Sequence, residues 1–149
     1  MTSSASIEDH AAALAEGIEA ALPEWVTGCV ERVMRAWAGC VPPDVARAAE
    51  FAGRQAQAET GALIRALLEA DISEQHSTPL ALLRQAVRYP TEVLRRAGVP
   101  PVERDRFARE AFPDDDYDLS PATWADVAPS LTELGITWGA AKAFEHKRR

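Results

Sequence analysis

The sequence has few of the residues that build metal centres, disulfide frameworks and catalytic sites. Its 149 residues include two cysteines and three histidines, and its eight glycines are scattered along the chain. It contains no GxGxxG or GxxxxGKS/T phosphate loop, no HExxH or CxxC metal motif and no GxSxG nucleophile motif. No histidine follows a glutamate by three positions, the spacing used in di-iron helical bundles. We therefore expect no metal and no cofactor, and no residue is assigned a catalytic role.

Long apolar runs are also missing, so no segment approaches the ~20 residues that a membrane helix needs. The first ten residues are polar and acidic and lack the basic and apolar regions of a secretory signal. Cys29 and Cys40 would lie about 16 Å apart on a continuous helix, which is too far for a disulfide. These features predict a cytoplasmic protein with reduced thiols, and leave open whether either thiol is reactive.

Positive charge is scarce, with 16 Lys and Arg against 23 Asp and Glu and a net charge of -7. This balance argues against general nucleic-acid binding, which depends on neutralising phosphates. Between residues 84 and 109, however, there are seven arginines and three acids. We expect five of these arginines to form a docking surface for an acidic partner, or for the acidic N-terminal half of the chain. They are Arg95, Arg96, Arg104, Arg106 and Arg109.

Residues 92–112 also have the pattern of a helix–turn–helix, with Gly98 at the turn and a recognition helix over 102–112. Acidic side chains within that helix would repel phosphates, so we expect a protein surface here and not a DNA-binding one. The acidic run 114–118 has the start of an EF-hand spacing, but Leu119 and Ala125 stand where calcium loops need Gly and Glu. We expect these acids to be solvated.

Helical periodicity repeats along the chain, and no segment alternates with a period of two for long enough to indicate a strand. The spacing predicts helices over 6–22, from Pro23 to about 38, over 44–70, 78–89, 91–98 and 99–112, from Ser120, and after Pro129. The predicted fold is an all-α single-domain bundle over 1–149, with long N-terminal helices, shorter proline-punctuated C-terminal ones, and frayed ends at 1–5 and 146–149. Trp37, Trp124 and Trp138 are expected in the core.

One carboxylate interrupts the apolar stripe of the predicted 44–70 helix. Glu59 lies between Ala56 and Leu63 at helical spacing, with Gln55 one turn before it. Exposure at the edge of the stripe is one interpretation; the other is a buried site, which requires a partner because an unpaired buried charge is costly. In that case Glu59 would meet Arg84 or Arg88 from the following helix. We expect a candidate buried polar or ligand site made of these residues: Gln55, Glu59, Arg84 and Arg88.

The segment RYPTEVLRRAGVPPVERDRFAREAFPDDDYDLSPATWADV, residues 88–127, together with WGAAKA at 138–143, resembles a group of small uncharacterised actinobacterial proteins. The resemblance covers roughly the last 70 residues. It implies a bacterial cytosolic setting and carries no activity, cofactor or catalytic residue.

These observations predict a protein–protein interaction module without catalytic activity, whose partner is another protein or a second copy of the chain. The alternative is a small-molecule-binding or enzymatic bundle with a polar pocket around Glu59.

Overall fold

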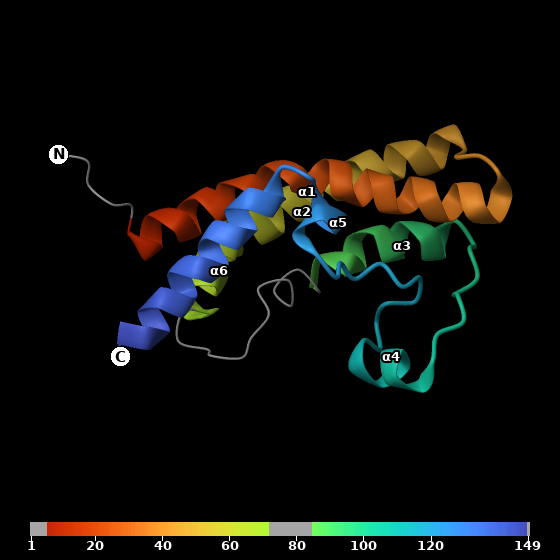
Figure 1. Ribbon diagram of the computed structural model, residues 1–149. Coiled ribbons are helices and arrows are strands. Elements are labelled where there is room, and N and C mark those ends of the chain that lie inside the picture. Colours follow the sequence, from red (N-terminus) through yellow and green to blue (C-terminus); the bar gives the residue numbers. More distant parts are fainter. Residues whose placement is uncertain (1–5, 72–84, 149) are drawn as a thin grey trace.

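The structure, a computed structural model, describes residues 6–71 and 85–148 (Figure 1). Within these ranges the chain forms six α-helices and no β-strand, which confirms the predicted all-α fold. The helices are α1 (Ile7–Ala38), α2 (Pro43–Asp71), α3 (Arg88–Arg96), α4 (Arg106–Ala111), α5 (Trp124–Val127) and α6 (Leu131–Arg148).

The first two helices form a long antiparallel hairpin that organises the molecule (Figure 1). One half of α1 is covered by α6, and α3 packs against both α1 and α2 towards the other end of the hairpin. The short helix α5 leads into α6 and contacts α1. The six-residue α4 has no buried residue and lies below α3 in Figure 1, away from the hairpin.

A single helix of 32 residues replaces the two helices that Pro23 was expected to divide. Its start is fixed by a reciprocal capping box in which the Ser6 side chain accepts from the Asp9 amide and the Asp9 side chain accepts from the Ser6 amide. It ends at Gly39, whose φ of 77° is the left-handed conformation typical of a helix C-cap. The prediction of a break at Pro23 is therefore wrong.

The reason that α1 continues through Pro23 lies on α2. Proline has no N–H, so the carbonyl of Glu19, four residues earlier, lacks its usual helical donor. The side-chain amide of Gln57 donates to this carbonyl at 3.0 Å. The α2 backbone comes close at Gly53, where an added Cβ would lie 2.8 Å from the Pro23 carbonyl oxygen. A neighbouring helix thus supplies the donor that the proline removes.

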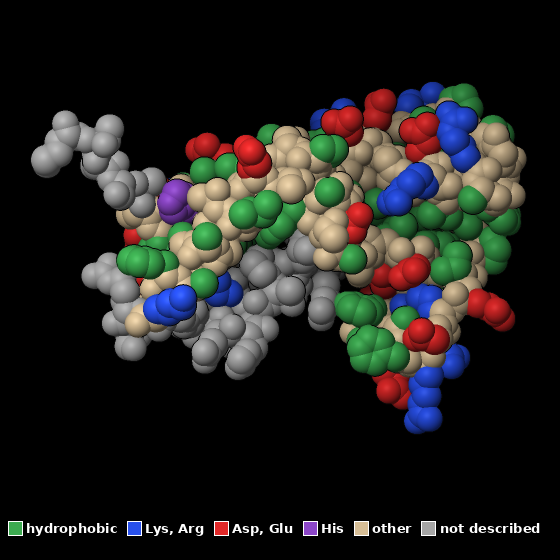
Figure 2. All heavy atoms as spheres, viewed as in Figure 1, with side chains coloured by type: hydrophobic (Ala, Val, Ile, Leu, Met, Phe, Trp, Pro, Cys, Tyr) green, Lys and Arg blue, Asp and Glu red, His purple; other side chains and the backbone are tan. Residues whose placement is uncertain are grey.

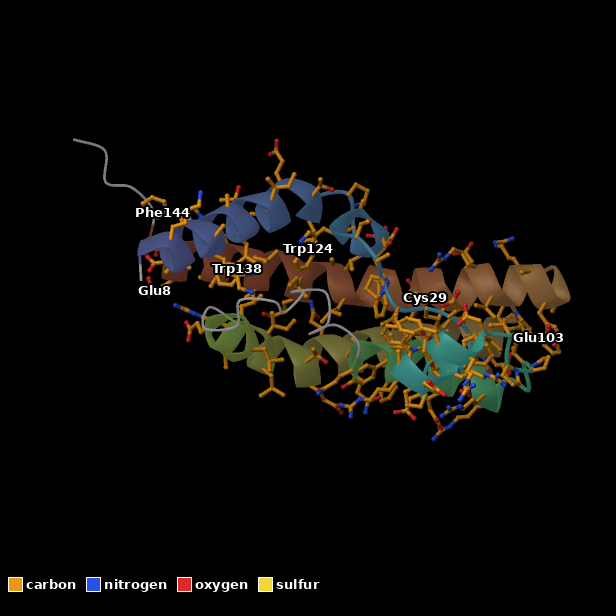
Figure 3. The ribbon with its side chains drawn as sticks, turned by 60° about the horizontal axis from the view of Figure 1, so that its bottom comes forward. Glu8, Cys29, Glu103, Trp124, Trp138 and Phe144 are labelled. Atoms are coloured by element: carbon orange, nitrogen blue, oxygen red, sulfur yellow. The ribbon has the colours of Figure 1, made fainter. Side chains whose placement is uncertain are left out.

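The core follows the inner sides of α1, α2, α3 and α6. Trp138 is completely buried between α6 and the hairpin, and Trp124 is partly buried against the same core (Figure 3). Trp37 is 50% exposed near the end of α1, so its predicted core position is wrong, because the hairpin ends there and brings no further layer over it. Trp25, which was not among the tryptophans expected in the core, is buried.

The C-terminal half differs from prediction at its prolines. Residues 78–84 of the predicted 78–89 helix lie outside the described residues. The Tyr89–Pro90 step begins α3 and does not break a helix, because first-turn amides have no intrahelical partner to lose. Thr91, the predicted first residue of the 91–98 helix, is buried inside α3.

Two more predicted helices are shortened, and the last one is extended. The segment 99–105 contains no helix, so of the predicted 99–112 helix only α4 forms, capped by the Asp105 side chain. The helix expected from Ser120 begins four residues later, at Trp124, and Thr123 and Asp126 form its capping box. The final helix begins after Ser130, as predicted, and continues to Arg148 through most of the expected frayed end.

The close contact at Gly53 generates a stability prediction. Gly53→Ala should lower the free energy of unfolding by about 1–3 kcal/mol, because the new methyl group meets backbone atoms of α1 that cannot move aside. Gly28→Ala on α1 is the matched control, since nothing lies within 4 Å of its added Cβ. It should raise stability by up to about 1 kcal/mol through helix propensity. Urea denaturation of the three proteins measures both effects, and equal stabilities of the two variants would contradict the close packing.

Candidate functional site

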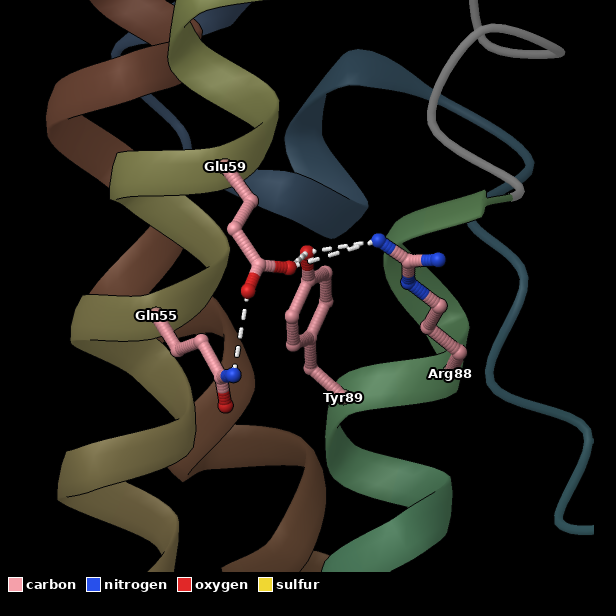
Figure 4. A network of polar contacts seen from close by, with 4 residues as sticks. All are labelled: Gln55, Glu59, Arg88 and Tyr89. Carbon is pink, nitrogen blue, oxygen red and sulfur yellow. Dashed lines mark hydrogen bonds and ion pairs between the residues drawn. The ribbon is translucent and has the colours of Figure 1, made fainter.

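Three of the four predicted polar site residues come together between α2 and α3. Gln55 and Glu59 lie one turn apart on α2, and Arg88 is the first residue of α3 (Figure 4). The fourth, Arg84, lies outside the described residues. Tyr89 on α3 completes the cluster and was not predicted. We call Gln55, Glu59, Arg88 and Tyr89 the Glu59 cluster.

Hydrogen bonds reach both oxygens of the Glu59 carboxylate. Gln55 Nε2 donates to Oε1 at 3.0 Å, and the Tyr89 hydroxyl donates to Oε2 at 2.5 Å. Arg88 Nη2 lies 3.4 Å from the same Oε2 and donates to the Tyr89 hydroxyl at 2.9 Å. The Arg88 guanidinium also lies 4.9 Å from the centre of the Tyr89 ring, within the range of a cation–π contact. The tyrosine therefore connects the two charges.

These contacts favour the ionised carboxylate. The hydrogen bond from Tyr89, followed by that from Gln55 and the charge of Arg88, lowers the pKa of Glu59 below its ordinary value. The Tyr89 hydroxyl in turn raises the pKa of Arg88. Both shifts favour the charged forms, and a carboxylate with a lowered pKa is a weak base at neutral pH.

The buried version of the site is wrong, because the Glu59 side chain is 46% exposed. The buried line on α2 passes through Ala52 and Ala56 and then moves to Ile64 and Leu68, whereas Leu63 is exposed. The predicted stripe keeps the period of a straight helix, about 3.6 residues per turn, whereas the residues that are buried move round the helix by about 80° between Ala56 and Ile64. The predicted line through Glu59 and Leu63 follows the edge of the interface and not its centre.

The Glu59 cluster forms one wall of an open groove of about 490 Å³ between α2 and α3. Four apolar residues also line the groove, and the most prominent is Phe51, which is 61% exposed. A second ion pair, Arg96 with Glu92 at 2.9 Å, also lines it. The apolar lining residues are Ala48, Phe51, Ala52 and Val93. Arg88 borders a second hollow of about 340 Å³ on the other side, lined also by Phe112 and Asp115.

The predicted arginine docking surface is largely neutralised by the chain itself. Arg95 pairs with Asp116 at 2.7 Å, Arg96 with Glu92, and Arg106 with Glu110 at 3.0 Å. Arg104 donates to the carbonyls of Phe112 and Ala108 and so closes the end of α4. Arg109 lies on the same helix. Figure 2 shows blue and red side chains interspersed over this part of the molecule, which therefore does not present a uniformly basic face.

The acidic loop 113–119 is built into the structure, so the expectation of solvated acids is wrong for part of it. Asp115 is buried and accepts hydrogen bonds from the amides of Leu119 at 2.7 Å and Ser120 at 2.9 Å. The buried Tyr117 donates its hydroxyl to the Val99 carbonyl at 2.8 Å. The Asp115 bonds hold the loop's own turn, whereas the Tyr117–Val99 bond and the Arg95–Asp116 pair attach the loop to the end of α3.

The two cysteines are both free thiols in different surroundings. Cys29 is buried in α1, and burial raises its pKa, which lowers its thiolate fraction and reactivity. Cys40 is exposed just after the helix ends. Among the described residues, no three His, Cys, Asp or Glu side chains gather closely enough to hold a metal ion. No helix in the described ranges is long and apolar enough to cross a membrane.

Comparisons of the chain with protein families, curated proteins and solved structures found no match. The resemblance to actinobacterial proteins therefore stays a prediction.

Removing the Tyr89 hydroxyl should release Glu59. In Tyr89→Phe the pKa of Glu59 should rise towards its ordinary value, since this hydroxyl is the strongest influence lowering it. Carboxyl-carbon NMR titration measures the change. Asp126 is the internal reference: its pKa is lowered by the amides of Thr123 and Ala122, and should stay the same.

The same cluster predicts a pH dependence of stability. Because the pKa of Glu59 is lowered on folding, the stabilising contribution is complete above the ordinary glutamate pKa of about 4.3 and is lost as the pH falls through the lowered value. Wild type and Tyr89→Phe should therefore differ more in unfolding free energy at pH 7 than in acid. A constant difference across this range would contradict the arrangement.

Proposed function

We propose that this protein is a non-catalytic interaction module that holds an amphipathic helical segment of a partner protein in the α2–α3 groove. The observation that carries this proposal is the exposed Phe51, with its apolar neighbours, beside the hydrogen-bonded Glu59 cluster. An aromatic ring of this kind offers the large apolar contact that dominates binding at interfaces. Grooves between two helices commonly accept a third helix through its apolar face.

The charges of the groove indicate how a partner would be recognised. Each of its two ion pairs, Arg88 with Glu59 and Arg96 with Glu92, contains one positive and one negative charge. The charged residues of the groove therefore have no excess of either sign. Affinity then comes from burying the partner's apolar side chains, and the ion pairs set orientation. Binding should depend weakly on salt, unlike the binding of an acidic partner to a basic surface.

A small-molecule site is the second candidate, because a volume of about 490 Å³ falls in the range of ligand pockets. Such pockets bury most of their ligand. Here the side chains of Glu59 and Arg88 are 46% and 66% exposed, which favours a surface contact over an enclosed ligand.

The two free cysteines support a reducing compartment, so a cytoplasmic location is part of the proposal.

Two truncations on α2 test the proposal. Phe51→Ala should reduce capture of the partner from a bacterial lysate by about tenfold or more, the loss typical of an aromatic hot spot. Leu63→Ala is the matched control, since Leu63 is 56% exposed on the same helix but does not line the groove. Quantitative mass spectrometry compares the captured proteins at low and high salt.

The results that would contradict the partner groove differ from those that would indicate a small-molecule site. Equal losses in the two variants, or capture that disappears at high salt, would contradict an apolar groove contact. A thermal-shift screen of metabolites addresses the alternative. A compound that raises the melting temperature of the wild type but not of Glu59→Gln would assign the groove to a small molecule.

A further inference from the structure

The outer face of α6 combines large apolar side chains with high exposure. Seven exposed residues lie within about 60° of Ala140 around the helix, at about 100° per residue. Ile136 is 65% exposed and Phe144 is 61% exposed; Figure 3 shows Phe144 towards the C-terminal end of the helix. We call this set the outer face of α6. Its residues are Glu133, Ile136, Thr137, Ala140, Ala143, Phe144 and Lys147.

The buried core residues of α6 lie on its other side. Leu131, Trp138 and Lys142 are buried there, and an added Cβ on Gly17 of α1 would collide with Leu131 and Leu134. A helix with apolar residues on both sides is typical of one buried on both sides. The outer face therefore has the composition of an interface, while its two large apolar side chains remain exposed in a single copy of the chain.

The residues of the outer face are arranged symmetrically about Ala140, so that the face is complementary to a second copy of itself. Ile136 and Phe144 are four residues on either side of Ala140, and Glu133 and Lys147 are seven residues on either side. When two such helices pair antiparallel, with Ala140 next to its own copy, each Ile136 meets a Phe144 and each Glu133 meets a Lys147. Thr137 then meets Ala143, so small residues lie at the centre where the backbones must approach.

We propose that a second copy of this chain docks on the outer face of α6, as an antiparallel helix pair with its two-fold axis at Ala140. Charge complementarity supports this occupant, because Glu133 and Lys147 carry opposite charges at mirrored positions. They are 14 residues, or about 21 Å, apart along one helix, so they can pair only between chains. A two-fold interface has this self-complementary form.

The contact area indicates a reversible dimer. The 18-residue α6 is about 27 Å long, and a single helix pair of this length covers less than the ~1,600 Å² of a standard stable interface. Dimerisation should therefore depend on protein concentration. The groove between α2 and α3 lies on other helices, and both contacts can exist together.

A charge exchange with rescue tests the proposed register. Glu133→Lys and Lys147→Glu should each weaken the dimer about tenfold or more, since each creates two like-charge contacts across the interface. The double variant should restore the wild-type dissociation constant, because it rebuilds both pairs with the charges exchanged. Sedimentation velocity over a concentration series measures the constants, and far-UV circular dichroism checks that every variant remains helical.

Two substitutions at the axis add an independent measurement. Ala140→Glu should abolish dimerisation, since two carboxylates would meet at the axis, whereas Ala36→Glu on exposed α1 should not. In a Cys40→Ser background, Ala140→Cys should form an intermolecular disulfide under mild oxidation, and Ala36→Cys should not. A wild type that stays monomeric at every concentration would overturn the proposal. So would a dimer that tolerates Ala140→Glu, or single charge variants that the double variant does not rescue.

Discussion

The packing of α2 against the Pro23 turn of α1 is the contact on which the rest of this structure depends. A proline in the middle of a helix leaves one carbonyl without a donor, and here Gln57 supplies that donor from the neighbouring helix. The contact requires the two backbones to lie close together, and Gly53 permits this because it has no side chain. One helix of 32 residues results where two shorter ones would otherwise be expected.

The length of α1 determines where α2, α3 and α6 can pack. Because the helix does not break, α6 and α3 can cover different parts of one continuous surface on α1, and α2 packs against both α1 and α3. The groove between α2 and α3 exists because α3 lies against both members of the hairpin. A break at Pro23 would have placed the two halves of α1 at an angle and removed the common surface.

The sequence predicts much of this fold where signals are local. The Ser6 cap, the continuous second helix and the start of the last helix all follow from capping residues, helix formers and proline at positions that suit a helix end. The failures involve tertiary contacts. Pro23 alone predicts a helix break, because the sequence does not show that Gln57 lies beside it. The spacing of Trp37 predicts a core position, because the sequence does not show that the hairpin ends there.

In the candidate site, too, local spacing predicts some residues and tertiary contacts supply the others. Helical spacing linked Gln55 with Glu59, and the need of a carboxylate for a cation pointed to Arg84 or Arg88, of which Arg88 lies within the described residues and makes the pair. Tyr89 was missed because its hydroxyl contacts a residue thirty positions away, and no local pattern marks such a pair. The arginine surface was misjudged for a related reason: counting charges in a window ignores Asp116, which lies outside the window and pairs with Arg95.

Arg88 occupies a wall shared by two hollows, the groove on one side and the space beside Phe112 and Asp115 on the other. Its guanidinium cannot move towards the second hollow without leaving Glu59. An occupant that attracts Arg88 into that space would therefore change the free energy of filling the groove, and by reciprocity a groove occupant would change the affinity of the second hollow by the same factor. Occupants of the two hollows would then be thermodynamically linked through this one side chain.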